Sequence, residues 1–232
     1  MAGLDRTAGV GHHRGMRLAD LSHVIEHQMI TYPGLPGPDI SEHLSFDASH
    51  DHYAAGTEFA IGRISMVANT GTYLDTPAHR FRDGHDLSAL SLQQCADLPA
   101  FLIDAVGAIG AAAFSDVEVT GSAVLLRTGW DRHWGTERYG DPAHPYLTEA
   151  GAQALVEGGA TLVGIDSVNI DDTTTGERPA HTLLLAAGIP IVEHLTGLAD
   201  LPRRGARFTA VPPAVRGLAT FPVRAFASVP TA

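Results

Sequence analysis

The sequence predicts a strand-rich, mixed α/β fold. Three observations support this prediction: short apolar runs recur along the chain, clusters of Gly, Pro and polar residues separate these runs, and few segments show helical spacing. Short runs bounded in this way are typical of strands. With 232 residues, of which 44% are hydrophobic, the chain is long enough to bury the core of one globular domain.

We expect residues 1–15 to form a flexible tail and residues 16–232 to form a single domain. Within this domain, segment 32–38 contains too much Pro and Gly for a helix or a central strand. The apolar or alternating segments that we expect to form strands are 17–25, 40–46, 58–68, 100–106, 123–127, 160–165, 189–192, 205–212 and 222–227.

Helical spacing is confined to three segments. Residues 87–98 show a short helical period, and Thr148 is a suitable N-cap for a helix that continues through residue 156. Residues 181–187 are followed by Gly188, a residue type that commonly ends helices. Helices at these places would flank a mixed sheet.

The composition restricts the classes of partner. A formal net charge of −11 argues against a nucleic acid or an anionic membrane surface, because both bind basic patches. Cys95 is the only cysteine, which excludes an internal disulfide and a cysteine-based metal cluster. No apolar run reaches the ~18 to 20 residues that cross a bilayer, and the N-terminal segment lacks the apolar core of a signal peptide. We therefore expect a cytoplasmic enzyme with a small-molecule substrate.

The stretch Asn69–Arg80 concentrates polar side chains directly after the alternating segment 61–68. A strand end can hold such groups in place while the following turn exposes them. Asp75 and His79 stand four positions apart around Pro77, so both can face one point. A carboxylate oxygen and a neutral imidazole nitrogen are suitable ligands for Zn²⁺ and related metals. The same two residues could instead be a capping Asp and a surface His.

A second acidic residue stands at a strand end. Glu193 directly follows the apolar segment 189–192. A carboxylate beside buried residues must be paired or ligated, because an isolated buried charge is too costly.

An aromatic cluster follows the strand expected at 123–127. Within residues 130–139 the chain places four ring-bearing side chains, Trp130, His133, Trp134 and Tyr139. Isolated exposed aromatic residues usually fill gaps, but four so close together could line a flat pocket for an aromatic or conjugated substrate.

These motifs resemble those of the cyclase family of metal-dependent hydrolases, whose best-known members are bacterial kynurenine formamidases. The family motif reads His-x-Gly-Thr-His-x-Asp-x-Pro-x-His, of which this chain keeps Gly71, Thr72, Asp75, Pro77 and His79. Asn69 and Tyr73 stand where the family has its first two metal-binding histidines. The segment 181–193 resembles the family's other metal-binding segment, and the resemblance as a whole covers residues 17–228.

The resemblance implies a swivelling β/β/α fold, hydrolysis of an amide or lactone bond in a small aromatic or conjugated substrate, and a homodimer or homotetramer. In the family, the loop that matches residues 32–38 lines the mouth of the active site. For this chain it implies one divalent metal, Zn²⁺ or Mn²⁺, because the loss of two imidazoles weakens a site for two metals. The implied ligands are Asp75, His79, His181 and Glu193.

Roles for the remaining site residues follow from the same resemblance. His79 would be a general base or a further ligand, and Tyr73 would orient the substrate or stabilise developing negative charge. Asp75 would be catalytic through the metal. The expected substrate-binding residues are Asn69, Thr72, Trp130 and Trp134.

Two other functions remain open. In the first, Tyr73, Asp75, His79 and Glu193 carry out metal-free acid–base chemistry, such as a cyclisation, dehydration or isomerisation. A general acid–base pair contributes roughly 10² to 10⁴ in rate. In the second, the chain is a catalytically inactive relative that only binds a ligand. The retained polar cluster argues against the second, because a buried polar cluster with no task is costly.

Overall fold

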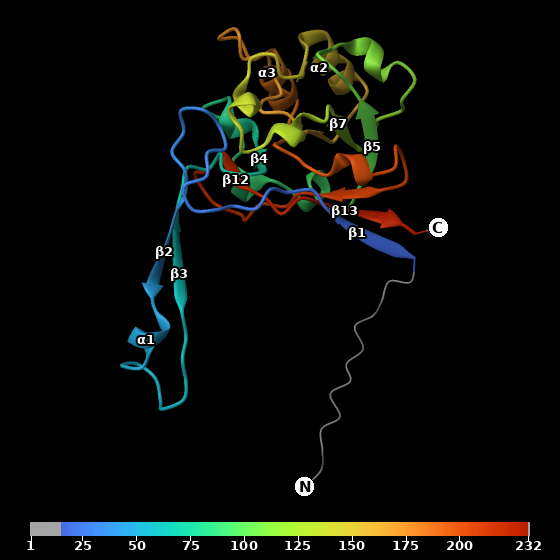
Figure 1. Ribbon diagram of the computed structural model, residues 1–232. Coiled ribbons are helices and arrows are strands. Elements are labelled where there is room, and N and C mark those ends of the chain that lie inside the picture. Colours follow the sequence, from blue (N-terminus) through green and yellow to red (C-terminus); the bar gives the residue numbers. More distant parts are fainter. Residues whose placement is uncertain (1–14, 232) are drawn as a thin grey trace.

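The computed structural model describes residues 15–231 and shows one large sheet flanked by helices (Figure 1). The expected tail at 1–15 lies outside the described residues except for Gly15. In spatial order, the strands of the large sheet are β1 (Met16–Asp20), β13 (Phe226–Pro230), β11 (Arg207–Thr209), β5 (Leu98–Asp104), β7 (Ala123–Arg127), β9 (Leu162–Ile165), β10 (Ile191–Glu193), β4 (Tyr73–Asp75) and β12 (Thr220–Pro222).

The middle of this sheet is parallel and buried. Strands β5, β7, β9 and β10 pair side by side in the same direction, and every residue of β9 and β10 is buried. Parallel strands that are covered on both faces read as continuous apolar runs. Helices α2 (Glu149–Glu157) and α3 (Pro179–Ala186) lie together on one side of the sheet (Figure 1).

Alternate residues of β7 enter two apolar clusters. Val124 and Leu126 belong to the cluster that contains the buried Ala and Leu side chains of α2 and α3. Ala123 and Leu125 belong to the other cluster, which contains Phe208 of β11 and residues of β1 and β13. The two-residue period of a strand therefore divides the core into two layers, one on each face of the sheet.

Antiparallel strands at one end of the sheet bring separate motifs together. Strand β4 pairs with β10 so that Tyr73 lies opposite Glu193 and Asp75 lies opposite Ile191. On its other edge β4 pairs with β12, where Thr220 lies opposite Asp75. Three short strands thus place side chains that are far apart in the sequence within one small unit.

A two-stranded arm, residues 39–65, extends away from the body of the protein (Figure 1). Strands β2 (Asp39–Leu44) and β3 (Ile61–Ser65) pair antiparallel along it, and helix α1 (Phe46–Ser49) lies in the connection between them. All five residues of β3 are exposed. The apolar side chains of the arm that are exposed include Ile40, Phe46, Tyr53, Phe59, Ile61 and Ile64.

Shorter elements complete the described part of the chain. Strands β6 (Ala108–Ile109) and β8 (Tyr146–Leu147) form a small parallel pair. The 3₁₀ helices are η1 (Pro77–His79), η2 (Leu87–Ala89), η3 (Leu92–Gln94), η4 (Ala111–Phe114), η5 (Trp130–His133), η6 (Glu137–Gly140) and η7 (Leu198–Asp200). Between residues 15 and 231, no helix has both the length and the apolar character that crossing a bilayer requires.

The predicted mixed α/β, strand-rich fold is confirmed, but the helix expected over residues 87–98 is wrong. Two separate turns, η2 and η3, occupy this segment, and β5 begins at Leu98. Asp86 caps the first turn, and Ser91 pairs with Gln94 in the second. Leu90 between them is extended, because a second capping residue inside a helical pattern starts a new turn.

Several strand bounds also differ from the expectation. The strand expected over 58–68 pairs only at Ile61–Ser65, and the sequence did not predict β4 inside the central motif. The strand expected over 222–227 divides into β12 and β13, which pair with opposite ends of the large sheet. Pro222 ends β12, consistent with its lack of a backbone N–H for a continued ladder.

Candidate metal centre and substrate pocket

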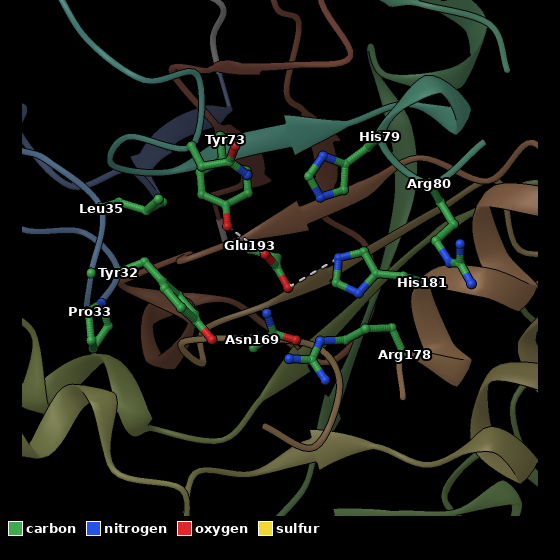
Figure 2. A pocket seen from close by; sticks show the side chains of 12 residues that line it. Tyr32, Pro33, Leu35, Tyr73, His79, Arg80, Asn169, Arg178, His181 and Glu193 are labelled. Carbon is green, nitrogen blue, oxygen red and sulfur yellow. Dashed lines mark hydrogen bonds and ion pairs between the residues drawn. The ribbon is translucent and has the colours of Figure 1, made fainter. Parts of the chain in front are cut away.

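A pocket of about 420 Å³ opens beside β4, β10 and the start of α3. Figure 2 shows Tyr73, His79, His181 and Glu193 converging on its interior. The loop 32–38 supplies part of the wall, as the resemblance implied for the mouth of the site. The lining residues are Tyr32, Pro33, Gly34, Leu35, Asn69, Tyr73, His79, Arg80, Asn169, Arg178, His181 and Glu193.

Asp75 ends β4 and is fully buried. Its Oδ1 accepts a hydrogen bond from the Thr220 hydroxyl. Its Oδ2 has no hydrogen-bond partner among residues 15–231, although the Nε2 atom of His181 lies 3.9 Å away. A buried carboxylate oxygen without a donor is costly. The geometry therefore marks Asp75 Oδ2 as a place where a cation would be stabilised.

His181 lies in the first turn of α3, and a second carboxylate orients its ring. Asp171 Oδ2 lies 2.6 Å from His181 Nδ1, and the same carboxylate accepts hydrogen bonds from the backbone N–H groups of Ala180 and His181. Asp171 thus caps the start of α3 and fixes the imidazole. A ring held in this way at Nδ1 presents Nε2 toward the pocket, which is the arrangement typical of metal-binding histidines.

Glu193, at the end of β10, is held by two donors. Its Oε1 accepts from the backbone N–H of Ile170 at 2.7 Å, and its Oε2 lies 2.7 Å from the Tyr73 hydroxyl. That hydroxyl lies 3.2 Å from His194 Nε2, and His194 Nδ1 lies 2.8 Å from the Tyr139 hydroxyl. An ionised carboxylate only accepts, so Tyr73 donates to Glu193. The Tyr73 oxygen then accepts from His194 Nε2–H, and the Tyr139 hydroxyl donates to Nδ1.

The sequence did not single out His194 or Asp171. Burial lowers the pKa of His194 to about 3, so its ring is neutral in this chain of hydrogen bonds. Its backbone adopts the left-handed region with φ 57°, a conformation that costs energy for a non-glycine residue and often occurs at functional sites. No local pattern reports these roles, because Tyr139 lies 55 positions from His194 in the sequence.

Three buried carboxylates, those of Asp75, Asp171 and Glu193, surround His181. Burial alone would lower the pKa of His181, but the hydrogen bond with Asp171 and the negative charges of Asp75 and Glu193 raise it to about 10. Burial and the charges of Glu193 and Asp75 raise the pKa of Tyr73 well above its ordinary value. The hydroxyl of Tyr73 is also already bound to Glu193 and His194, which favours a hydrogen-bonding phenol over a phenolate ligand at this position.

The residues present fit a divalent cation. Ligand atoms of Asp75, His79 and His181 lie within 4.8 Å of one another, and Glu193 Oε1 lies 3.8 Å from His181 Nε2. Carboxylate oxygens and imidazole nitrogens in this combination suit Zn²⁺ and Mn²⁺. The structure thus brings all four predicted ligands together, and their binding of a metal stays a prediction.

The expected substrate-binding residues divide into two groups. Asn69 lines the pocket, whereas Thr72, Trp130 and Trp134 do not. The Thr72 hydroxyl donates to the backbone carbonyl of His194 at 2.6 Å, so its hydrogen is used within the fold. The Trp130 indole is buried and donates to the carbonyl of Tyr139.

Trp134 lies outside the pocket because it stacks on another ring. Its ring centroid lies 3.8 Å from that of His23, with an interplanar angle of 5°, and both residues line a neighbouring cavity. The expected aromatic wall therefore does not come from residues 130–139. The phenol rings that line the pocket instead belong to Tyr32 and Tyr73.

Comparison with known sequences identifies relatives along most of the chain. A sequence profile of the family described as "Putative cyclase" matches residues 19–172. The kynurenine formamidase of Bacillus cytotoxicus is 28% identical over 179 residues, which cover 76% of this chain and 80% of that protein. The kynurenine formamidase of Geobacillus thermodenitrificans is 30% identical over 138 residues, or 58% of this chain and 64% of that protein.

Solved structures share the fold. Isatin hydrolase A from Labrenzia aggregata, bound to benzyl benzoate, superposes with a TM-score of 0.80 at 23% identity, covering 93% of this chain and 94% of that chain. A structure described as a "potential metal-dependent hydrolase with cyclase activity" has a TM-score of 0.74 at 23% identity, covering 92% and 98%. These likenesses confirm the cyclase-like fold. Because the profile spans more than half of the chain, this protein belongs to the cyclase family.

Proposed function

We propose that this protein is a metal-dependent hydrolase that cleaves an amide, formamide or lactone bond in a small aromatic or conjugated substrate. The observation that carries the proposal is the convergence of Asp75, His181 and Glu193 on one pocket, where Asp75 Oδ2 has no hydrogen-bond partner among residues 15–231. Relatives named kynurenine formamidase and structural neighbours named isatin hydrolase support this class of reaction. The pocket volume of about 420 Å³ suits a small molecule.

One divalent metal, Zn²⁺ or Mn²⁺, would be held by Asp75, His181 and Glu193. When bound, such an ion polarises a carbonyl group and makes water a stronger acid. A single ion is favoured because Asn69 and Tyr73 replace two imidazoles of the family motif. In addition, the Tyr73 hydroxyl already donates to Glu193 Oε2.

His79 is placed to act as the general base. The Thr220 hydroxyl has one hydrogen, which it donates to Asp75, so its oxygen accepts from His79 Nδ1–H at 3.0 Å. His79 Nε2 then carries a lone pair, and the ring lines the pocket. Asp75 Oδ1 lies 3.6 Å from His79 Nδ1, where its charge stabilises the imidazolium that forms when Nε2 takes a proton from water.

Tyr73 and Asn69 have supporting roles in this proposal. Tyr73 holds the Glu193 carboxylate in place through its hydroxyl. Asn69 lines the same pocket, and its amide N–H groups can donate to a substrate oxygen that gains negative charge.

The alternative is a metal-free cyclase, dehydratase or isomerase. The observation that favours it is the hydrogen-bonded chain from Glu193 through Tyr73 to His194 and Tyr139. This chain occupies the position of a lost imidazole with groups that donate and accept protons. In this alternative, His79 and Glu193 move protons on the substrate and no ion takes part.

Metal analysis of protein purified without a histidine tag tests both functions. We expect about one Zn²⁺ or Mn²⁺ per chain, loss of aryl formamide or lactone hydrolysis after dialysis against a chelator, and recovery when the ion is returned. Turnover that survives complete metal removal would support the acid–base alternative. Absence of both metal and hydrolysis would overturn the main proposal.

We also propose that the protein works in the cytoplasm as a homodimer or homotetramer. A two-stranded hairpin is only marginally stable by itself in water, and the arm exposes Phe59 (51%), Ile61 (46%) and Ile64 (49%). Contact with a second copy would bury these side chains.

Light scattering tests the assembly. The wild type should have the mass of a dimer or tetramer, and Ile64→Glu should reduce this mass. The matched control is Arg63→Gln, which changes the neighbouring exposed position of β3. A monomeric wild type at all concentrations would contradict the proposal.

A further inference from the structure

We propose that the pocket binds a carboxylate of the substrate through Arg178 and Arg80. This inference rests on the proposed function and assigns to two residues the recognition of a carboxylate on an aryl amide, formamide or lactone. Both arginines line the pocket, and Figure 2 shows their guanidinium groups on two sides of His181, with that of Arg178 beside Asn169. Neither belongs to the metal site described above.

Arg178 is held in place by one edge of its guanidinium group. Its Nη1 donates to the backbone carbonyls of Asp172, Thr175 and Glu177 at 3.2, 2.8 and 2.6 Å. Within residues 15–231, its Nε and Nη2 atoms have no hydrogen-bond partner. These two atoms form the planar fork that matches a carboxylate in a bidentate pair. A side chain that is fixed before binding loses little entropy when the ligand arrives.

Arg80 supplies a second, more exposed cation. Its Nε donates to the Thr182 hydroxyl at 3.1 Å, and the guanidinium lies 5.6 Å from the centroid of the Phe81 ring. In the described chain, no carboxylate lies within 4.0 Å of Arg80 or Arg178. Arg127 and Arg203 differ in this respect, because both pair with Asp104.

The opposite wall of the pocket is apolar. Figure 2 shows Tyr32, Pro33 and Leu35 on one side, with Arg80 on the other and the Arg178 guanidinium beside Asn169. An aromatic substrate with one anionic group fits this division. Its ring would face Tyr32 and Leu35, its carboxylate would face the arginines, and its scissile carbonyl would lie between them, near His181.

The two arginines of the pocket stand out because the protein as a whole is acidic. The protein has a formal net charge of −11, so its overall field does not attract anions. Within the pocket, a divalent cation would offset the charges of Asp75 and Glu193. Neither guanidinium group forms an ion pair within residues 15–231, so each can accept a substrate carboxylate as a direct partner.

A structural role for Arg178 must be separated from recognition, because its Nη1 also fixes the loop 172–177. The test uses matched pairs of substrates: 2-, 3- and 4-formamidobenzoate, each compared with the corresponding formamidobenzamide. The amide has nearly the same shape but no charge. The measured quantity is the ratio of kcat/KM for the acid to kcat/KM for the amide, because damage to the fold lowers both values and leaves the ratio unchanged.

The wild type should prefer at least one formamidobenzoate over its amide by about 10-fold or more. Arg178→Gln should lower this ratio roughly 10- to 100-fold, as expected for a charge-assisted bidentate pair, and the more exposed Arg80→Gln should lower it roughly 3- to 10-fold. Arg82→Gln is the matched control, because it removes the same charge from an exposed residue outside the pocket lining and should leave the ratio unchanged.

Two results would overturn the inference while the proposed hydrolase stands: equal use of acid and amide by the wild type, or equal losses on both substrates in Arg178→Gln. If no formamide is hydrolysed at all, the proposed function fails. The inference is then decided by calorimetric titration of benzoate and benzamide into proteins of equal metal content. Benzoate should bind more tightly than benzamide to the wild type, and Arg178→Gln should remove that difference. Equal binding would refute the inference.

Discussion

The two halves of the site differ in how far they keep the family motif and in how their side chains are supported. The half formed by α3 and β10 is complete: Asp171 orients His181, and two donors hold Glu193. The half formed by β4 and η1 lacks two family histidines. In this half the Tyr73 hydroxyl joins Glu193 to His194. A position that differs from the family motif is therefore tied into the site by hydrogen bonds.

The largest effect is expected where the two halves meet, at Asp75. Asp75→Asn removes the charge that faces both His79 and His181. We expect metal content to fall to near zero and kcat/KM to fall roughly 10²- to 10³-fold. The control is Asp83→Asn, an exposed residue in the turn after η1. If Asp75→Asn kept its metal and its turnover, the proposed centre would be wrong. A wild type that binds a ligand but shows no turnover would indicate an inactive binding protein.

A smaller effect is expected from the support of the complete half. Asp171→Asn removes the carboxylate behind His181 while it leaves an oxygen for the helix cap. Metal affinity should fall roughly 10- to 100-fold, as for other groups that orient a metal-binding histidine, and titration with Zn²⁺ measures it. Asp172→Asn is the control, since within residues 15–231 the Asp172 side chain accepts hydrogen bonds only from Thr174. Equal affinities in the two variants would show that Asp171 only caps α3.

The half formed by β4 and η1 can be tested at Tyr73. Tyr73→Phe leaves Glu193 Oε2 and His194 Nε2 without this partner, so we expect a loss of about 1 to 3 kcal/mol in unfolding free energy. Turnover should fall roughly 10-fold, because Glu193 is then less firmly held. Chemical denaturation and kinetics measure the two effects. A variant as stable and active as the wild type would show that the hydrogen-bonded chain has no role.

The smallest change in rate is expected when the two histidines of the family motif are restored. This change is also the sharpest test of the difference between the two halves. The double variant Asn69→His/Tyr73→His returns two imidazoles to the first half. We expect the metal content to rise from about one to about two ions per chain by elemental analysis, with a change in turnover of less than about 10-fold. Asn69→His alone is the control and should keep one ion. If the double variant also binds only one ion, Asn69 and Tyr73 are not what limits the site.

The sequence predicted which residues converge on the site better than it predicted the residues that hold them in place. Asp75 and Glu193 stand at strand ends, where a local pattern and the family motif both indicate function. Asp171, His194 and Tyr139 were missed as supporting groups, because their roles depend on how distant segments cross. Trp134 shows the same limit: its ring type suggested a substrate wall, but stacking on His23 turned it toward another cavity.

The fold was predicted at the level of strands and their apolar runs, and less well in short irregular segments. Buried strands such as β7 and β9 read directly as apolar runs. The failure at residues 87–98 arose because helical spacing was counted without its internal caps. Strand β4 was missed because a three-residue strand made of Tyr, Leu and Asp carries too little local signal.

The pairing of β4 between β10 and β12 has a consequence for how the protein matures. Tyr73, Glu193 and Thr220 meet only when strands separated by more than a hundred residues have docked, and such long-range contacts form slowly. A nascent or partly folded chain therefore has no assembled cation site. Uptake of the proposed ion would report that β4, β10 and α3 have docked, and it would stabilise only chains that have reached that state.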